Sequence, residues 1–428
     1  MVRKWPFYYG WVIVGVVVLA GLADTIQTLP VLSIFLLPIT EEFGWSRTTY
    51  TSAITIGTIM GALMAPFVGR LLDRYGGRWM LVGAFVVLGG SMILLSTVSV
   101  LWQFFALQIL ARLMHMGVIT VALMGSIIPR WFVLRRGRAV AISGMGLRGG
   151  LTLNPLFVQF LVARGTWRTA AVGVGILVWV LSLLPIAIFL RRKPEDVGLL
   201  PDGETPEHRE ERLRRAAAST DATSRDLDAS LTLHEVLRLP SFYLMAISFS
   251  LAMTITSGIS FHAIPYFTDQ GLGGGAAVGL VSLYGAVAAG GMLASGFVIE
   301  RVNVRFTLVV TTAIMGLAML YMMAADTVPL GLVWSITFGL AEGSVFVTQQ
   351  VAFADYFGRE SLGSIRGVLM TMQILANAVG AMAGAIVFDV TDTYWPLLLA
   401  FGTCGLVSAF LMFLARPPKM KSMRAAPQ

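Results

Sequence analysis

Long apolar stretches fill almost the whole of this 428-residue chain, and they constrain its fold more than any other feature. A helix needs about 20 mostly apolar residues to cross a bilayer, and it pairs its own backbone polar groups while doing so. Twelve stretches reach this length: 9–37, 47–69, 79–97, 101–127, 139–162, 168–190, 241–267, 276–299, 306–324, 329–353, 363–388 and 393–415. We therefore expect an all-α membrane protein with twelve transmembrane helices.

A charged loop pattern occurs twice between these stretches. Gly69-Arg70-Leu71-Leu72-Asp73-Arg74-Tyr75-Gly76-Gly77-Arg78 follows the second stretch, and Gly296–Arg305 repeats its Gly, acid, Arg and final Arg 227 residues later. An internal repeat with charged loops at matching positions is typical of a transporter built of two halves. We expect one six-helix bundle at 1–190 and a second at 241–416. A polar linker at 191–240 would join them, and a short tail would follow at 417–428.

The net charge of +8 follows the expected topology and does not form a nucleic-acid-binding patch. With the N-terminus in the cytoplasm, 26 of the 31 Lys and Arg residues fall on the inner side, and the outer loops hold only Arg47, Arg164 and Arg168. This bias is the positive-inside rule. We expect both termini in the cytoplasm, basic loops in contact with anionic lipid, and no nucleic-acid partner.

The chain carries no signature of catalysis. It has no phosphate-binding Gly loop with Lys-Ser/Thr, no Cys/His spacing for a metal, and no Ser/His/Asp constellation outside the apolar stretches. Its one cysteine, Cys404, falls in the last stretch, so a disulfide framework is excluded. We expect no enzymatic activity, no cofactor and no bound metal.

The loop at 69–78 resembles the signature of the major facilitator superfamily, G-x-L-x-D-R-x-G-x-R, at every specified position. The resemblance implies a cytoplasmic gate at this loop, in which the acid caps a neighbouring helix end and pairs with basic residues. The residues that carry it here and in the repeat are Gly69, Asp73, Arg74, Arg78, Glu300 and Arg301. A tight turn with lipid-facing cations is the alternative.

Within that superfamily the chain is most similar to the bacterial branch related to monocarboxylate transporters and the oxalate/formate antiporter. The stretches that carry this similarity are Tyr8–Trp11, Phe35–Ile39, Trp131-Phe132, Arg136–Ala139, Lys193–Gly203, Asp355–Arg359 and Gly363–Gly367. One feature departs from the pattern. The stretch 276–299 has no Lys or Arg, and the body of 363–388 after Arg366 has none either, which argues against a dicarboxylate clamp of the oxalate type.

Five positions place ionisable side chains inside the apolar stretches, where each needs a partner or a role because burying a charge in hydrocarbon is costly. They are Asp24, Arg112 with His115 one turn later, Arg148, His262 and Glu342. Asp24, Arg112, Arg148 and Glu342 count to about mid-membrane at ~1.5 Å per residue. For His115, simple packing is the favoured interpretation.

These residues admit a structural and a functional interpretation. In the first they form buried ion pairs that hold the bundles together. In the second, the guanidinium of Arg148 or Arg112 binds an anionic substrate through two parallel hydrogen bonds, with Asn377, Gln373 and Tyr284 completing the pocket. Candidate proton carriers are Glu342, Asp24 and His262; Gly339 and Gly343 would leave Glu342 with little side-chain shielding.

We expect a secondary transporter of a small organic anion, a monocarboxylate, with a proton as the coupling ion. Anion exchange is the nearest rival, followed by proton-coupled efflux of an organic cation with Asp24 and Glu342 as ligands; a receptor that does not transport is a further alternative. The resemblance also implies a monomer in the inner membrane of a bacterium.

Overall fold

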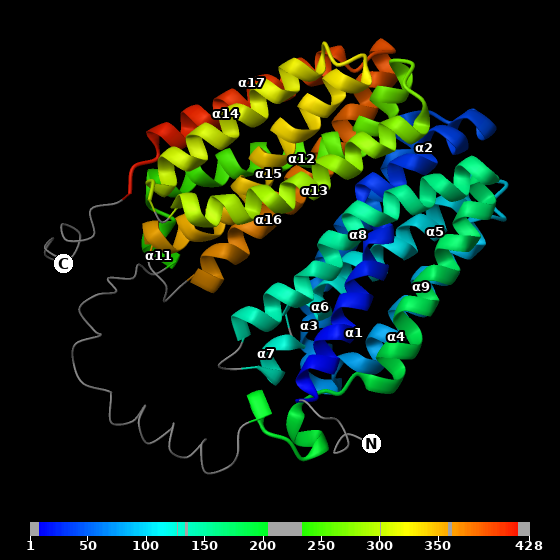
Figure 1. Ribbon diagram of the computed structural model, residues 1–428, viewed down its shortest axis with the longest axis vertical. Coiled ribbons are helices and arrows are strands. Elements are labelled where there is room, and N and C mark those ends of the chain that lie inside the picture. The colour runs from blue at the N-terminus through cyan, green and yellow to red at the C-terminus, as the bar shows by residue number, and fades with distance from the viewer. Residues whose placement is uncertain are drawn as a thin grey trace, which may run out of the picture. The chain divides into compact units, whose positions relative to one another are not determined.

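The computed structural model describes residues 8–125, 127–132, 136–203, 233–299, 301–357 and 362–417, and these residues contain no strand. The chain divides into two compact units, 1–220 and 221–428, which we describe separately (Figure 1). Every long element in either unit is a helix, so the all-α expectation is confirmed for the described residues.

The helices of each unit follow one another with short connections. The N-terminal unit contains α1 Gly10–Asp24, η2 Thr25–Gln27, α2 Leu29–Phe43, α3 Arg47–Tyr75, α4 Gly77–Leu95, α5 Leu101–Leu113, η3 Met114–Ile119, α6 Thr120–Gly125, α7 Ile128–Trp131, α8 Arg136–Arg164, α9 Trp167–Phe189, η4 Pro194–Val197 and η5 Pro201–Gly203. The C-terminal unit contains α11 Leu233–Val236, α12 Pro240–Asp269, α13 Gly274–Ile299, α14 Val304–Met322, α15 Val328–Phe357, α16 Leu362–Thr391 and α17 Trp395–Leu414.

Local sequence explains several helix ends. Ser46 begins α3 by accepting the backbone N–H of Thr49 at 3.0 Å, and Thr166 begins α9 in a capping box with Thr169. Gly44 ends α2 with a φ of +66°, a left-handed conformation that glycine adopts without a steric cost.

Ten helical segments are long and apolar enough to cross a membrane, with α1 and α2 counted together as one segment. The two remaining long helices, α3 and α8, have 29 residues each but carry four charged residues apiece. Both helices are long enough to cross a bilayer at ~1.5 Å per residue.

The predicted internal repeat is visible in the helix positions. α3, α4 and α5 begin at Arg47, Gly77 and Leu101, and α13, α14 and α15 begin 227 residues later in each case. α4 and α14 also end with the same offset. The duplication detected in one loop therefore extends over consecutive helices.

The two units also use the same helix pairings. α1 packs on α8, α3 on α5 and α4 on α9, and the corresponding pairs in the second unit are α12 with α16, α13 with α15 and α14 with α17. Glycine lies at the closest approach of every pair, because small residues let helix backbones come together in lipid. Examples, in the same order, are Gly146, Gly57, Gly89, Gly380, Gly343 and Gly405.

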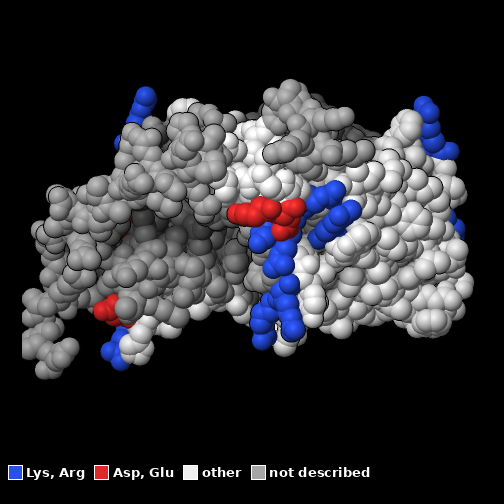
Figure 2. All heavy atoms as spheres, turned by 90° about the horizontal axis from the view of Figure 1, so that it is seen from below, with Lys and Arg blue, Asp and Glu red and all other residues white. Residues whose placement is uncertain are grey.

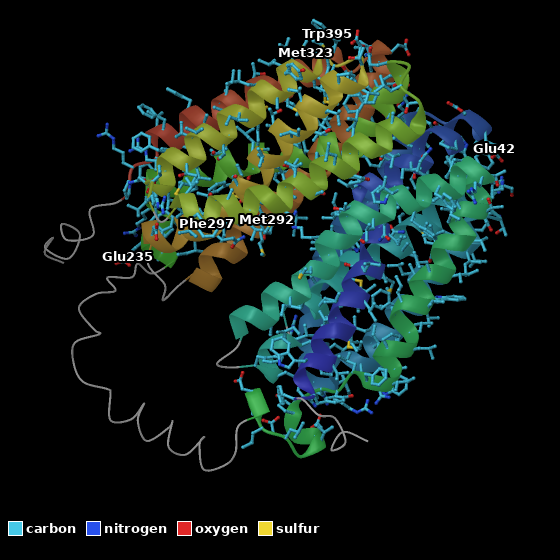
Figure 3. All side chains as sticks on the ribbon, in the orientation of Figure 1. Glu42, Glu235, Met292, Phe297, Met323 and Trp395 are labelled. Atoms are coloured by element: carbon cyan, nitrogen blue, oxygen red, sulfur yellow. The ribbon has the colours of Figure 1, made fainter. Side chains whose placement is uncertain are left out.

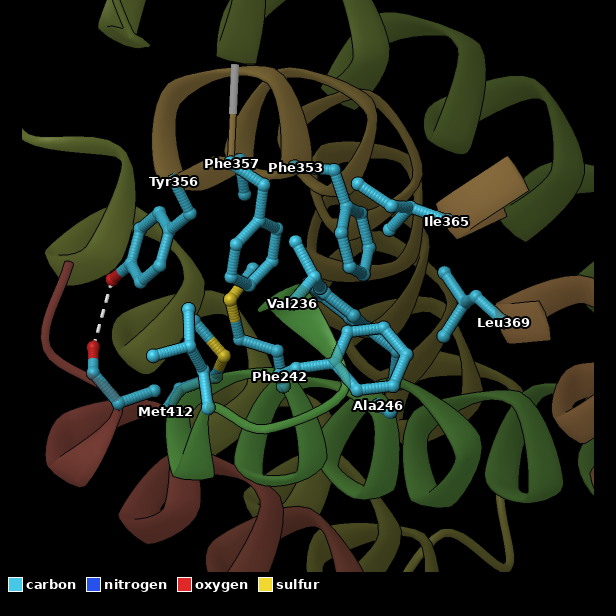
Figure 4. Packing of buried hydrophobic residues seen from close by; sticks show 14 of the residues in the cluster. Val236, Phe242, Ala246, Phe353, Tyr356, Phe357, Ile365, Leu369 and Met412 are labelled. Atoms are coloured by element: carbon cyan, nitrogen blue, oxygen red, sulfur yellow. Dashed lines mark hydrogen bonds between the residues drawn. The ribbon is translucent and has the colours of Figure 1, made fainter. Parts of the chain in front are cut away.

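An apolar cluster closes the end of the C-terminal unit at which α12 begins (Figure 4). Val236 of α11 is buried there against residues of α12, α15, α16 and α17, including Phe242, Phe353 and Met412. Tyr356 donates a hydrogen bond from its hydroxyl to the carbonyl of Ala415 at 2.8 Å. This part of the expected linker, 233–239, is therefore packed onto the C-terminal unit.

The first part of the expected linker packs onto the N-terminal unit. Residues 194–203 form the turns η4 and η5, Pro194 is buried, and the indole of Trp131 donates to the carbonyl of Arg191 at 3.4 Å. At this end Figure 2 shows Lys and Arg side chains beside acidic ones. The exposed charged residues of this region include Arg74, Arg192, Lys193, Glu195 and Asp196.

Two tyrosine hydroxyls form hydrogen bonds between segments at this end of the N-terminal unit. Tyr8 donates to the carbonyl of Trp131 at 2.9 Å, and Tyr9 donates to the carbonyl of Phe189, at the end of α9, at 2.8 Å. Burial raises the pKa of both hydroxyls above the ordinary range; the charge of Asp202 adds to this for Tyr8, whereas Arg191 acts in the opposite direction on Tyr9. Both hydroxyls therefore remain protonated donors at neutral pH.

A charged and aromatic group closes the opposite end of the N-terminal unit, where Figure 3 labels Glu42. Arg168 forms an ion pair with Glu42 at 2.6 Å, and it also donates to the carbonyls of Ser96 at 2.6 Å and Val98 at 3.0 Å. The indole of Trp167 donates to Glu42 at 2.5 Å. These contacts connect the ends of α2, α4 and α9.

Candidate functional site

The first membrane-crossing segment is broken near its middle, where the sequence predicted one continuous helix over 9–37. α1 ends at Asp24, a 3-10 turn follows, and Thr28 is extended (φ −78°, ψ 156°) before α2 begins. Pro30 lies in the first turn of α2, where its missing N–H costs nothing, whereas a continuous helix would lose a hydrogen bond at this position. The break leaves backbone carbonyls open to side-chain donors.

The fourth membrane-crossing segment is irregular where it faces this break. α5 passes into a six-residue π-helix, Met114–Ile119, and then into α6. A π-helical turn accommodates an extra residue and is frequent at functional sites. The turn packs closely on α3, since a Cβ on Gly117 would lie 3.2 Å from the carbonyl oxygen of Gly61. The sequence expectation of a regular helix over 101–127 is corrected here.

Asp24 and His115 form a buried pair across these two irregular segments. Oδ1 of Asp24 lies 2.6 Å from Nδ1 of His115, and the two residues are 3% and 5% exposed. At this distance the two atoms share a hydrogen bond, with the proton held between an imidazole nitrogen and a carboxylate oxygen. The expectation that His115 merely packs is wrong, because its ring is paired with an acid.

Arg112 lies beside this pair and is 1% exposed. Its Nε donates to the hydroxyl of Thr58 on α3 at 3.0 Å, and its Nη1 donates to the carbonyl of Gln27 at the end of the 3-10 turn. Asp24 is close enough to interact with the guanidinium electrostatically. The structure thus unites Asp24, Arg112 and His115 in one buried cluster, which we call the N-terminal charge cluster.

Asn154 of α8 supports the break in helix 1, and sequence analysis did not single it out. It is 2% exposed, and its Nδ2 donates to the carbonyl of Leu22 at 2.8 Å and to the hydroxyl of Thr25 at 2.7 Å. A polar residue followed by Pro155 in an apolar stretch is a signal that could have identified it. Asn154 joins the end of α1 to α8.

Two buried glutamines also lie in this region and were not predicted. Gln27 belongs to the 3-10 turn, and Gln108 lies one turn before Arg112 on α5; they are 0% and 1% exposed. Within the described part of the chain, Oε1 of Gln27 and both amide atoms of Gln108 lack a hydrogen-bond partner. Buried polar groups are nearly always paired, so these atoms are exceptions in the polar region around the break.

Arg148 lies on α8 between two points of contact with helix 1. A Cβ on Gly146 would meet the backbone of Val18, and one on Gly150 would meet the side chain of Thr25. The Arg148 side chain is partly buried rather than fully buried. The structure therefore brings Arg148 onto the helix that packs against the break, and its contact with substrate stays a prediction.

Glu342 of α15 is partly buried, and the neighbouring glycines have a different role from the one expected. A Cβ on Gly339 would lie 2.6 Å from the carbonyl oxygen of Tyr284, and one on Gly343 would meet the carbonyl of Ala288. Both glycines therefore allow α15 to pack closely on α13. Proton coupling by Glu342 stays a prediction.

Tyr284 belongs to an aromatic cluster in the C-terminal unit. Its hydroxyl lies 2.7 Å from that of Ser260 on α12, and its ring packs on Trp334 and Phe338 with centroids 5.8 Å and 5.5 Å away. Trp334 and Phe338 are fully buried and stack on each other at 5.6 Å. Trp334 and Phe338 therefore pack within the C-terminal unit.

His262 of α12 is 1% exposed, and both of its ring nitrogens have hydrogen-bond partners. Nε2 lies 2.8 Å from the carbonyl oxygen of Ala381 on α16, so it must donate. Nδ1 lies 3.0 Å from the hydroxyl of Tyr394, which can donate to it. This geometry fits a neutral His262 that joins α12 to α16 and to the start of α17, and it favours a structural role over proton coupling.

Gln373 and Asn377 lie one turn apart on α16, as the sequence spacing predicted, and both are partly buried. The main-chain carbonyl of Asn377 accepts a hydrogen bond from Ser257 of α12 at 2.8 Å. Both residues belong to the C-terminal unit, and the contact of their side chains with substrate stays a prediction.

The sequence model of the Major Facilitator Superfamily matches residues 13–328 and 280–428 of the chain. The chain belongs to this superfamily. The relatives that it resembles include mouse monocarboxylate transporter 12, 24% identical over 98% of this chain and 88% of that protein. Zebrafish monocarboxylate transporter 12-B is 28% identical over 64% of this chain and 59% of that protein. The superfamily comprises transporters, and its membership makes this chain an integral membrane protein of a transporter family.

Among solved structures the chain resembles a bacterial homologue of the human lysosomal transporter Spinster. The TM-score is 0.69 at 15% identity, and the match covers 95% of this chain and 97% of that one. At this identity the likeness shows the facilitator fold and nothing about substrate.

The superfamily signature proves to be largely helical. Gly69 and Arg74 lie in the last turns of α3, and the loop itself is reduced to Gly76, whose φ is +81°. Arg74 is exposed and lies over the ring of Tyr75 at 5.3 Å. The side chain of Asp73 lies outside the described structure, as does Glu300 of the repeat, and Arg301 is exposed. Their gating role stays a prediction.

The final arginine of each signature copy binds the end of the sixth helix in its own unit. Arg78 donates through Nη2 to the carbonyl of Ala187 in the last turn of α9. Arg305, 227 residues later, donates through Nε to Met412 at 3.3 Å and through Nη2 to Phe413, in the last turn of α17. A cation at a helix C-terminus satisfies free carbonyls and the helix dipole. The two arginines thus stabilise equivalent helix ends.

Proposed function

We propose that this facilitator is a secondary active transporter of a small organic anion, a monocarboxylate, that crosses together with a proton by alternating access. The observation that carries the proposal is the N-terminal charge cluster beside the break in helix 1. An ionisable group at the bilayer centre costs at least ~2.5–3.5 kcal/mol even on insertion scales. Three such groups at interrupted helices are typical of substrate and coupling-ion sites in transporters.

In this proposal the arginines bind the substrate and the acids bind the proton. Arg148 binds the carboxylate of the substrate, because a guanidinium offers two parallel donors to a carboxylate, and Arg112 provides a second positive charge. Asp24 takes part in proton binding, and Glu342 is the candidate carrier in the other unit. A proton and a monocarboxylate together carry no net charge, so their joint passage is not opposed by the membrane potential. The names of the relatives support a monocarboxylate substrate.

The proposal includes twelve membrane crossings, with α3 and α8 completing the set, and both termini in the cytoplasm. Six crossings in each unit would bring the beginning and the end of each unit to the same side. A monomer in a bacterial inner membrane is the setting that the sequence resemblance supports.

Because Cys404 is the only cysteine, Cys404→Ala provides a background for single introduced cysteines. A membrane-impermeant maleimide applied to whole cells should fail to label a cysteine placed near either terminus, and labelling would refute this orientation.

A thermal shift experiment tests the substrate class first. The full-length protein, purified in detergent, is heated with acetate, L-lactate, pyruvate, oxalate, tetraphenylphosphonium or glucose. A ligand that binds the native state raises its melting temperature by mass action. We expect a rise with a monocarboxylate that is lost in Arg148→Ala. A rise with the organic cation alone, retained in Arg148→Ala, would replace the proposal with cation efflux through Asp24 and Glu342.

Transport in proteoliposomes then distinguishes symport from exchange. We expect the monocarboxylate to accumulate inside vesicles when the outside is made more acidic, without any anion loaded inside. Uptake that requires an internal anion and ignores the pH gradient would instead establish an exchanger.

A further inference from the structure

The pair formed by His115 and Asp24 has a specific consequence for coupling. We propose that His115 carries the transported proton, with Asp24 as its fixed partner, so that the two side chains act as one proton-binding pair in the N-terminal unit. The inference rests on the proposed function and adds a residue to it. Its basis is the 2.6 Å separation of Nδ1 and Oδ1, the burial of both groups and their position between two irregular helical segments.

Among the charged groups on the surrounding elements, Arg112 interacts electrostatically with Asp24 of the pair. The charges of α3, α4 and α9 lie near the ends of these helices: Arg47, Arg70, Asp73 and Arg74 on α3, Arg78 on α4 and Arg168 on α9. α8 carries Arg148 near its middle, and α6 carries no charged residue. Arg148 is therefore the second cation that the balance of charge has to include.

The proton balance follows from the hydrogen bond. When the pair is loaded, Nδ1–H donates to the Asp24 carboxylate and Nε2 of the imidazolium holds the transported proton, so the pair is neutral overall. Release breaks the Nε2–H bond and gives the proton to water, leaving a neutral imidazole that still donates through Nδ1 and a pair with a charge of −1. The Nδ1–H···Oδ1 bond is present in both states, so Asp24 sets the tautomer of His115.

This change of charge acts on Arg112, which is protonated throughout. Without the proton, Asp24 and Arg112 cancel and the N-terminal charge cluster is neutral. With it, the cluster has a charge of +1 and attracts an anion toward α8, the helix that carries Arg148. Proton binding therefore comes before anion binding, and release of the proton expels the anion. This order is that of a symporter.

The helix irregularities give the pair its geometry. His115 lies in the π-helical turn at Met114–Ile119, three residues after Arg112. Gly117 and Gly61 hold this turn against α3, and Asn154 holds the end of α1 against α8. The pair therefore joins two elements that are each anchored separately.

His262 offers a contrast within the same chain. It is equally buried, and its ring nitrogens form hydrogen bonds with a carbonyl and a tyrosine hydroxyl, a geometry that fits the neutral ring. Nδ1 of His115 instead faces a carboxylate oxygen.

The first experiment needs no substrate. The full-length protein, labelled with ¹⁵N-histidine and held in detergent micelles, contains four histidines: His115, His208, His234 and His262. Comparison with His115→Gln assigns the His115 signals. We expect Nε2 of His115 to gain a proton as the sample is acidified over the pH range in which the protein stays folded, while Nδ1 stays protonated, and we expect Asp24→Asn to change this behaviour. A His115 ring that stays neutral over this range, or one unaffected by Asp24→Asn, would overturn the proposal.

The second experiment measures coupling in proteoliposomes with the monocarboxylate identified above, or with L-lactate. We expect His115→Gln, which keeps a donor for Asp24, to lose accumulation driven by the pH gradient while retaining counterflow between equal anion pools. His234→Gln, at an exposed position on α11, is the matched control and should behave as wild type. Accumulation by His115→Gln at the wild-type level would refute the role of His115.

The two experiments separate the possible failures. A wild-type protein that moves no carboxylate overturns the proposed function, while the titration of His115 still tests the pair by itself. Retained counterflow in His115→Gln also shows that the variant is folded.

Discussion

Replacing two glycines of α8 that lie two residues apart should change stability in opposite directions. A Cβ on Gly146 would lie 2.7 Å from both Cα and C of Val18 and closer still to its carbonyl oxygen, whereas a Cβ on Gly144 would have nothing within 4 Å. Gly146→Ala therefore forces α1 and α8 apart, and Gly144→Ala does not. The two variants share the helix, the chemical change and the neighbourhood.

The distances give the size of the effect. Ordinary contact begins at 3.4 Å, so the backbone of Val18 must retreat by at least about 0.7 Å. Overpacking of this kind costs ~1–3 kcal/mol. The same displacement weakens the two bonds from Asn154 to the end of α1, each contributing ~1 kcal/mol. The gain from replacing Gly by Ala inside a helix offsets at most ~1 kcal/mol in either variant.

The free energy of unfolding of Gly146→Ala should therefore be ~2–4 kcal/mol lower than that of wild type. Gly144→Ala should be as stable as wild type or slightly more stable. A difference of this size separates the melting temperatures of the two variants by about 2–4 °C. Thermal unfolding of the purified proteins, followed by tryptophan fluorescence, measures it. Equal melting temperatures for the two variants would refute the close packing of α1 on α8.

Four further variants probe other contacts, each by the same thermal measurement. Arg78→Ala and Arg305→Ala should destabilise the protein by similar amounts, ~1.5–3 kcal/mol, because each leaves helix-end carbonyls without a charged donor; a large loss in only one of them would contradict the equivalence of the two units. Tyr284→Phe should cost ~1 kcal/mol by removing the bond to Ser260, and an unchanged stability would show that the bond is not formed. Asn154→Leu should lower stability by ~1–3 kcal/mol because the hydroxyl of Thr25 and the end of α1 lose their donor, whereas a gain would show that packing matters more there.

The sequence predicted the duplicated architecture well because each helix that crosses a bilayer requires an apolar stretch of similar length. Apolar stretches of fixed length follow from the bilayer, and the final arginine of each signature copy lies at the same point of the repeat. Arg78 and Arg305 indeed bind equivalent helix ends. Their common target, the last turn of the sixth helix, was not predictable, because it depends on which helix packs beside α4 and α14.

The candidate site was predicted in its residues but not in its geometry. Asp24 and Arg112 were recognised as charges inside apolar stretches, whereas His115 was interpreted as packing. The pair joins positions 91 residues apart, and the helical turn that presents His115 is a π-helix inside an unbroken apolar run. Hydropathy does not register such a turn, because π- and α-helical residues have the same composition.

The amino-acid sequence by itself determined that this chain crosses a membrane repeatedly and that its two halves are copies. Both conclusions follow from hydrophobicity and spacing, which are local properties of the chain. Only the tertiary structure decided that helix 1 breaks after Asp24, that Arg112 binds the carbonyl of Gln27, and that His115 reaches the carboxylate. These features arise because buried polar groups must find partners on neighbouring helices, and the partners are known only once the helices have packed.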